Sequence, residues 1–439
     1  MPYYENSVGT MLRKPLNYTE ARELSVMAGK VLKPRSPITT RELFAGRWTH
    51  LTTLADAVGQ HGLHVAVYGE RGVGKTSLAN VVKPTIMAFD SQVPGGTQDE
   101  PFKRLVIQAN TNSGDRFFDI WEKLFADITW QDDRPTVGLH PGRRDRTSLR
   151  EAFGLPDTLS VDDVRRTISS LPGSVFIIDE FDRAAPETSR AFTDLIKALS
   201  DFAVDCTVIL VGVSDTVDQL ISDHASISRA IIQIPLPRMQ PTELDEILMN
   251  AEKSLSVEFS AEARSLIVHL SQGLPHYTHL IGLHAVRKAV LERNSTEIEQ
   301  QDVFDALKEA VHQSQQTVTE KHSKATHSAH KDALYRHVLL ACAVAAATSH
   351  DALGYFNPGS LLGPLETILA RPVEVATFNS HLAEFCQLKR GGVLERIGQP
   401  RAFRYRFHDP LLVPFVFMDA LAHKIISDDQ ITSMLGDSF

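Results

Sequence analysis

One segment of eight residues limits what this chain can fold into more than any other feature. It reads Gly69-Glu70-Arg71-Gly72-Val73-Gly74-Lys75-Thr76 and fits the pattern G-x-x-x-x-G-K-[ST]. The apolar run at 64–68 before it predicts a buried strand, and residues 77–82 after it predict a helix that ends or kinks near Pro84. Converging backbone N–H groups and the positive end of a helix dipole attract phosphates. The segment therefore predicts a phosphate-binding loop.

Each residue type in this loop suits a nucleotide. Gly74 lets the backbone approach the phosphates closely, Lys75 can reach the β- and γ-phosphates, and the Thr76 hydroxyl can ligate Mg²⁺. We therefore expect ATP or ADP with Mg²⁺ as the cofactors. The residues expected to contact the nucleotide are Glu70, Arg71, Gly72, Val73, Gly74, Lys75, Thr76 and Ser77.

A second stretch, residues 174–180, is a continuously apolar strand that ends in two acids, Asp179 and Glu180. Ligands of open α/β folds bind at the carboxyl edge of the sheet, where both carboxylates would lie. We predict that Asp179 joins Thr76 in holding Mg²⁺ and that Glu180 orients the water that attacks the γ-phosphate. Such a pair suits water better than an acceptor hydroxyl, which favours an ATPase over a kinase. A strand that merely runs into a solvated acidic loop is the alternative, and the phosphate loop disfavours it.

The strands expected at 64–68, 103–109, 175–178 and 207–213 alternate with helical patterns. This alternation predicts an α/β fold, a P-loop NTPase parallel sheet covered by helices on both faces. After about residue 235 the hydrophobic period changes to that of helices, which predicts an all-α lid without strands, followed by a C-terminal winged-helix domain. The domains that we expect are an N-terminal arm laid against the next domain (1–40), a nucleotide-binding αβα domain (41–237), a helical lid (238–312), a linker or helix extension (313–331), and the winged-helix domain with a tail (332–439).

Composition excludes several classes of protein. Three cysteines in 439 residues, all far apart, give neither a disulfide framework nor a C-x-x-C metal pattern, which suits a reducing cytoplasm. The longest apolar run, 338–347, is half a membrane span, and the N-terminus does not resemble a signal peptide. A net charge of −9 argues against a protein that coats nucleic acid throughout but leaves room for a local basic surface. We expect a cytoplasmic protein without a membrane contact.

Two short strands at 392–397 and 403–407, with a turn between them, resemble the wing of a winged helix. The segment contains one acid, Glu395, and six cations, so that it carries +5 on an acidic protein. The cations are Lys389, Arg390, Arg396, Arg401, Arg404 and Arg406. Double-stranded DNA is one partner for these side chains, and another domain or subunit is the other.

The linker at 313–331 contains three histidines, His322, His327 and His330. The linker itself contains no cysteine or aspartate, so we interpret these histidines as solvated side chains of an exposed helix and not as a metal site.

In the order of its motifs, the chain resembles the AAA+ ATPases. The order runs from Gly69–Thr76 through Asp179-Glu180, Ser214 and Arg229 to the lid and the winged helix. It is most similar to the initiator and loader clade, whose relatives include origin-recognition and bacterial transposition target-selection ATPases. The resemblance covers about residues 40–310 well and the winged helix loosely.

This resemblance implies a lid that closes over the nucleotide and ATP sites shared between neighbouring subunits. Ser214 matches the polar residue that touches the γ-phosphate or the attacking water. Arg229 falls where a trans-acting arginine finger would lie, with Arg190 and Arg238 as alternatives. His276 stands where the lid often carries a second-sensor arginine, which implies slow hydrolysis.

Together these features predict an ATPase whose ATP-bound state assembles subunits and exposes a surface for DNA or a partner protein. A regulatory ATPase that recruits an effector, as in phage defence, with little or no DNA binding, is one alternative. A nucleotide-held scaffold with slow turnover is another.

Overall fold

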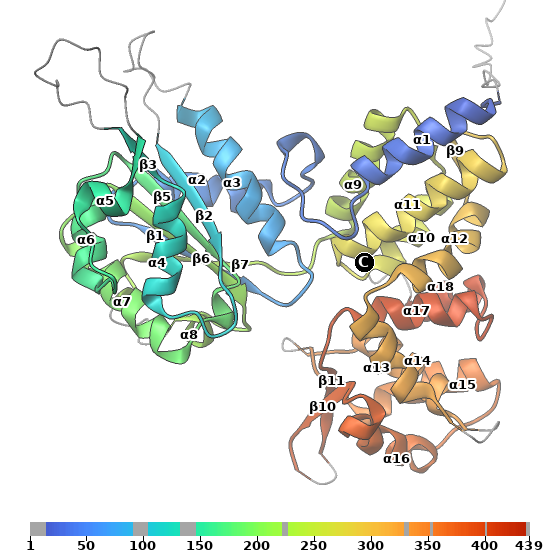
Figure 1. The fold of residues 1–439 in the computed structure, drawn as a ribbon. Coiled ribbons are helices and arrows are strands. Elements are labelled where there is room, and N and C mark those ends of the chain that lie inside the picture. The colour runs from blue at the N-terminus through green and yellow to red at the C-terminus, as the bar shows by residue number, and fades with distance from the viewer. Residues whose placement is uncertain are drawn as a thin grey trace, which may run out of the picture. The chain divides into compact units, whose positions relative to one another are not determined.

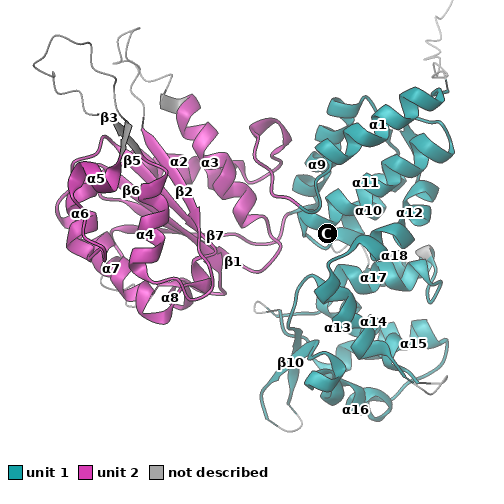
Figure 2. Ribbon diagram, in the orientation of Figure 1, with its two compact units in different colours: residues 1–35, 240–439 teal, residues 36–239 magenta. Residues whose placement is uncertain are grey.

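The structure is a computed structural model of the chain (Figure 1). It describes residues 15–90, 104–131, 146–221, 227–328, 333–351, 354–399 and 402–435. The chain forms two compact units, one of residues 36–239 and the other of residues 1–35 with 240–439 (Figure 2).

A five-stranded parallel sheet lies at the centre of unit 36–239, with the strand order β2-β5-β6-β1-β7. Its strands are β1 (His64–Gly69), β2 (Leu105–Asn110), β5 (Ser174–Asp179), β6 (Cys206–Val213) and β7 (Ile231–Pro235). Every residue of β5 is buried, as expected for a central strand covered on both faces. The predicted α/β P-loop NTPase sheet is confirmed.

Helices cover both faces of this sheet (Figure 1). α2 and α3 pack together on one face, and α4, α6 and α7 pack on the other. We predicted that the helix after the phosphate loop ends or kinks near Pro84. It does not end there, because α3 continues to Asp90. The remaining elements of the unit are η1 (Arg41–Leu43), α2 (Trp48–Val58), α3 (Lys75–Asp90), α4 (Phe117–Ala126), β3 (Thr129–Gln131), β4 (Arg146–Ser148), α5 (Leu149–Phe153), α6 (Val161–Ser169), η2 (Phe181–Arg183), α7 (Pro186–Asp201) and α8 (Val217–Leu220).

The core beneath α4 is built around Trp121, whose side chain is fully buried. Its ring centroid lies 5.0 Å from that of Phe176 in β5 and 6.0 Å from that of Phe192 in α7. This cluster joins two helices to the strand that ends in Asp179 and so fixes one edge of the candidate site.

The second unit is mostly helical. Helix α11 is its most central element, with contacts to α1, α9, α10 and α12. The elements are α1 (Tyr18–Val31), α9 (Pro241–Leu255), β8 (Glu258–Phe259), α10 (Ala261–Ser271), α11 (Pro275–Glu292), β9 (Glu297–Ile298), α12 (Gln300–Gln313), α13 (Gln316–Thr326), α14 (Tyr335–Thr348), η4 (Pro358–Leu361), α15 (Leu362–Leu369), α16 (Val375–Phe385), η5 (Leu388–Arg390), β10 (Leu394–Ile397), β11 (Arg404–Phe407), α17 (Leu412–Ala422) and α18 (Asp428–Leu435).

Three predictions about this unit were wrong. The N-terminal arm was expected to lie against the nucleotide-binding domain, but α1 packs on α9 and α11 of the helical unit. The lid was expected to have no strands, but β8 and β9 form a short parallel pair. His322 was expected to be solvated, but it is buried, 3.5 Å from Asp419, because α13 packs one face on α14 and α17. His327 is exposed as predicted, and His330 lies outside the described residues.

In the described part of residues 335–407, helices α14, α15 and α16 precede the antiparallel hairpin of β10 and β11. Phe356 forms a bridge to Tyr405 that extends the hairpin by a third, short segment. This order is consistent with the predicted winged helix, which stays a prediction, as do the domain boundaries. Across the described ranges, no helix is both long and apolar enough to cross a membrane, and no three potential ligand side chains gather as a metal site would require.

Candidate nucleotide-binding site

Glycines give the predicted phosphate loop its conformation. Gly72 and Gly74 have φ values of 91° and 98°, in the region where a Cβ atom is strained. A Cβ on Gly69 would lie 2.3 Å from the Leu236 carbonyl oxygen, because the segment after β7 runs directly beside this residue. The Leu236 N–H donates to the Tyr68 carbonyl at 2.7 Å. The loop is therefore fixed by its own glycines and by its neighbouring segment.

Lys75 begins α3 and is only 8% exposed. Its Nζ donates to the carbonyl oxygens of Gly69 at 2.9 Å and Glu70 at 2.8 Å. Burial lowers the pKa of Lys75 to about 8, although Asp182, Asp179 and Glu70 act in the opposite direction. The ammonium thus lies over the loop and is bonded to neutral carbonyls, where anionic phosphates would be stronger acceptors.

Asp179 ends β5 with a carboxylate that is 2% exposed. Its Oδ1 accepts the Glu180 N–H at 2.8 Å, whereas its Oδ2 is buried without a hydrogen-bond partner. Burial raises the pKa of Asp179, and the hydrogen bond from the Glu180 N–H and the nearby Thr76 hydroxyl oppose that effect. A buried carboxylate oxygen that lacks a partner, close to a threonine hydroxyl, fits the oxygen ligands that Mg²⁺ prefers. Thr76 and Asp179 could therefore hold this ion.

Glu180 adopts a left-handed conformation with φ of 55°, which is uncommon for a residue other than glycine. Its carboxylate forms an ion pair with Arg183, three residues along the chain in η2. Both side chains are about half exposed, at 47% and 48%. The predicted water-orienting group thus lies at the sheet edge, held by an arginine that we did not predict.

Ser214 follows β6 and is buried. Its N–H donates to the Gly69 carbonyl at 3.4 Å, and its hydroxyl bonds to the backbone of Thr216. The structure therefore brings Ser214 to the same sheet edge as the phosphate loop and Asp179, where the resemblance predicted it.

Arg229 lies near the amino ends of the strands, whereas the phosphate loop lies at their carboxyl ends. It precedes β7, whose first residue, Ile231, pairs with His64 at the start of β1, far along the strand from the loop. Its side chain is exposed. Arg229 is therefore separated from its own phosphate loop by the length of β1.

Two residues that we did not predict as part of the site support it. The Asp182 Oδ1 accepts the Val213 N–H at 2.7 Å, which ties η2 to the end of β6. Arg238, which we named only as an alternative arginine finger, forms two bonds with Glu70: Nε to Oε1 at 2.5 Å and Nη2 to Oε2 at 3.2 Å. No local sequence signal indicates the second pair, because 168 positions separate its members.

Further contacts tie both ends of the unit to this region. The Ile38 N–H donates to the Ser77 Oγ at 3.1 Å. The buried Arg47 guanidinium donates to the Pro237 carbonyl. The first and last segments of unit 36–239 therefore run beside the phosphate loop.

His276, at the predicted second-sensor position, lies in the first turn of α11. Its Nδ1 is 2.6 Å from the Pro34 carbonyl oxygen, and its ring meets the Tyr277 ring edge-on. The imidazole is thus engaged within its own unit, and the slow hydrolysis that we inferred from it stays a prediction.

Carboxylates of the same unit pair with half of the six cations in the predicted basic wing. Of its six cations, Lys389 and Arg396 are exposed, and Arg401 lies outside the described residues. The other three form ion pairs: Arg390 with Glu384, Arg404 with Asp351, and Arg406 with Glu395. Because two of these acids lie outside the wing segment, a charge count over the segment alone overstated its positive charge.

Aromatic rings also engage the wing arginines. The Arg390 guanidinium lies 3.7 Å from the centroid of the Tyr335 ring, and that of Arg406 lies 4.8 Å from the Tyr355 ring. Cation–π contacts of this kind hold a guanidinium in place even where it is partly exposed. The arginines thus contribute to the cohesion of the unit.

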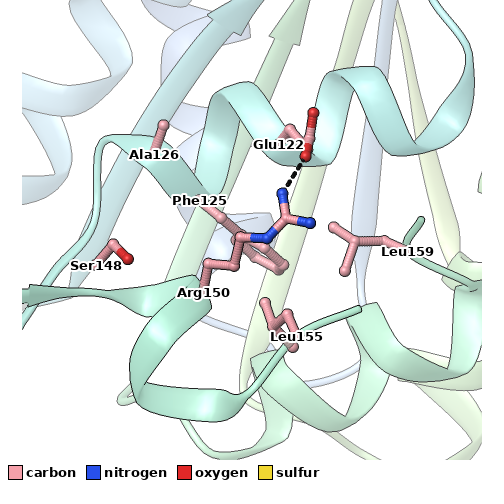
Figure 3. A pocket seen from close by; sticks show the side chains of 7 residues that line it. All are labelled: Glu122, Phe125, Ala126, Ser148, Arg150, Leu155 and Leu159. Carbon is pink, nitrogen blue, oxygen red and sulfur yellow. Dashed lines mark hydrogen bonds and ion pairs between the residues drawn. The ribbon is translucent and has the colours of Figure 1, made fainter. Parts of the chain in front are cut away.

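A pocket of about 310 Å³ lies between α4 and α5 (Figure 3). Arg150 reaches across it, with its Nη1 2.5 Å from the Glu122 Oε1 and its Nη2 2.8 Å from the Asp157 Oδ1. The lining residues are Glu122, Phe125, Ala126, Ser148, Arg150, Leu155 and Leu159. None of the predicted nucleotide-contacting residues lines it, so it is distinct from the phosphate loop.

A family model described as Novel STAND NTPase 1 matches residues 38–352, more than half of the chain. The chain belongs to this family. The match confirms the predicted P-loop NTPase fold, and it spans the phosphate loop, Asp179 at the end of β5 and Glu180 directly after it. A search of curated proteins finds no match.

Several solved structures are similar to this STAND NTPase. They include the ORC2 protein of Aeropyrum pernix in ADPNP and ADP complexes, at 16% identity over 92% of this chain and 98% of that chain, with a TM-score of 0.48. Cdc6p from Pyrobaculum aerophilum is 15% identical over 92% and 98%, with a TM-score of 0.44. The Thermotoga maritima RuvB Holliday junction branch migration motor is 17% identical over 85% and 95%, with a TM-score of 0.39.

Proposed function

We propose that this STAND NTPase binds ATP with Mg²⁺ at residues 69–77 and hydrolyses it to ADP and phosphate. One observation carries the proposal. The buried ammonium of Lys75 and the unpartnered oxygen of Asp179 lie at one sheet edge, where the cation can hold phosphates and the carboxylate can hold the ion. When bound, Mg²⁺ supplies positive charge to the phosphate oxygens. Glu180 would orient the attacking water after its carboxylate leaves Arg183.

Replacement of the loop cation tests nucleotide binding. Lys75→Ala removes a charge-assisted contact to the phosphates and should weaken the binding of ATP with Mg²⁺ by at least tenfold (about 1.4 kcal/mol) in calorimetry. Lys83→Ala is a matched control, because Lys83 is exposed on the same helix, α3. Equal affinities of wild type and Lys75→Ala would disprove the site.

We further propose that the ATP-bound state drives self-association through shared sites. Support comes from Arg229, which is exposed at the end of the strands opposite its own loop, so that its guanidinium is available to the nucleotide of another subunit. Sedimentation with and without an ATP analogue measures this directly. A protein that stays monomeric in both states contradicts the proposal.

For the partner of the assembled state, we favour a protein over DNA. Three wing arginines are paired with acids of their own unit. In addition, α16, the α-helix that precedes the hairpin, carries no lysine or arginine that could contact DNA phosphates. DNA binding through Lys389, Arg396 and Arg401 is the alternative. Anisotropy of labelled duplex DNA at low salt, with an ATP analogue, separates the two. Binding that falls steeply with salt and is weakened by Lys389→Ala with Arg396→Ala would favour DNA.

We also propose a cytoplasmic location. Its support is that all three cysteines are free, two of them buried, so that nothing in the fold depends on an oxidising compartment.

A further inference from the structure

The phosphate loop contains a carboxylate close to where phosphates are expected. Glu70 directly follows Gly69 in the loop, and its side chain is 33% exposed. A bare carboxylate there would repel a polyphosphate, because like charges that share a partly buried site interact strongly. The Arg238 guanidinium, 34% exposed, bonds both oxygens of this carboxylate and cancels its charge.

We propose that Arg238 is a positioning residue that neutralises Glu70 and thereby lets the loop accept a nucleoside polyphosphate. The bidentate geometry also fixes the direction of the Glu70 side chain, since two parallel bonds restrict it more than one does. The inference rests on the proposed binding of ATP at this loop. It differs from an arginine-finger role, because the guanidinium acts on its own chain and through another side chain.

The backbone around Arg238 is set in place before any ligand arrives. The Leu236 N–H bonds to the Tyr68 carbonyl, and the buried Arg47 bonds to the Pro237 carbonyl. Both contacts lie within two residues of Arg238. Its guanidinium is therefore held beside the loop by the fold, and the pair does not depend on a flexible surface side chain finding its partner.

A double-mutant cycle tests the proposal. The affinity for a non-hydrolysable ATP analogue with Mg²⁺ is measured by calorimetry for wild type, Arg238→Gln, Glu70→Gln and the double variant. Arg238→Gln should bind about tenfold more weakly at low salt, because it exposes the Glu70 charge to the phosphates. The double variant, which has neither charge, should recover most of that loss. The deficit of Arg238→Gln should shrink as salt rises.

Arg165→Gln is the matched control for the change in net charge. Arg165 pairs with Asp162 on α6, away from the loop, and its replacement should leave the affinity unchanged. Melting temperatures without nucleotide show whether each variant is folded. If Arg238→Gln does not fold, Glu70→Gln alone still tests the proposal. Because Glu70→Gln removes the repelling charge, it should bind the ATP analogue with an affinity equal to or higher than that of wild type.

Three results would overturn the proposal. If the double variant binds as weakly as Arg238→Gln, the guanidinium acts on the phosphates directly. If Arg238→Gln binds like wild type, or Glu70→Gln binds more weakly, the pair has no electrostatic role in binding. A wild-type protein that binds no nucleotide would instead disprove the proposed function itself, which separates the two failures.

Discussion

Nucleotide binding should be accompanied by the uptake of a proton by Lys75. Burial holds the pKa of this ammonium at about 8 in the free protein. Phosphate oxygens at the Nζ favour its charged form, so the bound state should keep the proton well above that pH. The number of protons taken up per nucleotide is then the fraction of Lys75 that is neutral before binding. It is about 0.1 at pH 7, about 0.5 at pH 8 and about 0.9 at pH 9.

Calorimetry in two buffers with different ionisation enthalpies measures this number, because the apparent binding enthalpy changes in proportion to the protons exchanged. Affinity should fall as the pH rises above 8, since binding then requires protonation. Lys75→Arg is the matched control, because a guanidinium stays charged throughout this range and should show no uptake. Proton release, or no exchange at pH 8 and 9 in the wild-type protein, would refute the account of Lys75.

The same shift affects stability in the absence of ligand. The folded-state pKa lies below the ordinary value of 10.5, so the unfolded chain binds more protons between about pH 8 and 10.5. The contribution of Lys75 to the free energy of unfolding is therefore unfavourable below pH 8, and this penalty disappears as the pH rises through that window.

Three further perturbations address other parts of the molecule. Glu180→Gln should keep ATP bound but slow phosphate release by about 10²–10⁴-fold; wild-type turnover would remove Glu180 from the mechanism. Arg229→Ala should abolish any rise of specific ATPase activity with protein concentration, since an arginine finger contributes about 10³–10⁵ in rate; a rise that persists would exclude it. Trp121→Ala should lower the free energy of unfolding by about 3–5 kcal/mol in urea titrations, because its ring packs fully buried between Phe176 and Phe192; a loss below 1 kcal/mol would show that the core collapses around the gap.

The sequence alone was sufficient to predict features that depend on residues close together in the chain. The phosphate loop is contiguous, and its glycines, Lys75 and Thr76 follow from the geometry of a single turn. The position of Asp179 was predictable because it ends an apolar strand, and parallel strands end at one edge of a sheet. Ser214 was named only through the resemblance to AAA+ ATPases.

Contacts between distant segments were not predictable in the same way. Glu70 and Arg238 meet only because β1 and β7 pair, and nothing local marks either residue as the partner of the other. The wing charge was overestimated for a related reason, since Asp351 and Glu384 approach the arginines only after the helices have packed. His322 reads as polar in the sequence, but helix packing buries it.

The division of the chain has a consequence for the order in which it folds. Helix α1 is synthesised before unit 36–239, yet its packing partners α9 and α11 come after the roughly 200 residues of that unit. At about 5–20 residues per second, α1 waits some 10–40 s for them on the ribosome. Early folding of the inserted unit shortens this search, because its first and last segments are fastened to one loop and helix through Ser77 and Glu70. Once this unit has folded, its two ends are held in place, and α1 and α9 are no longer joined by about 200 flexible residues. The entropy cost of bringing α1 to α9 is therefore lower.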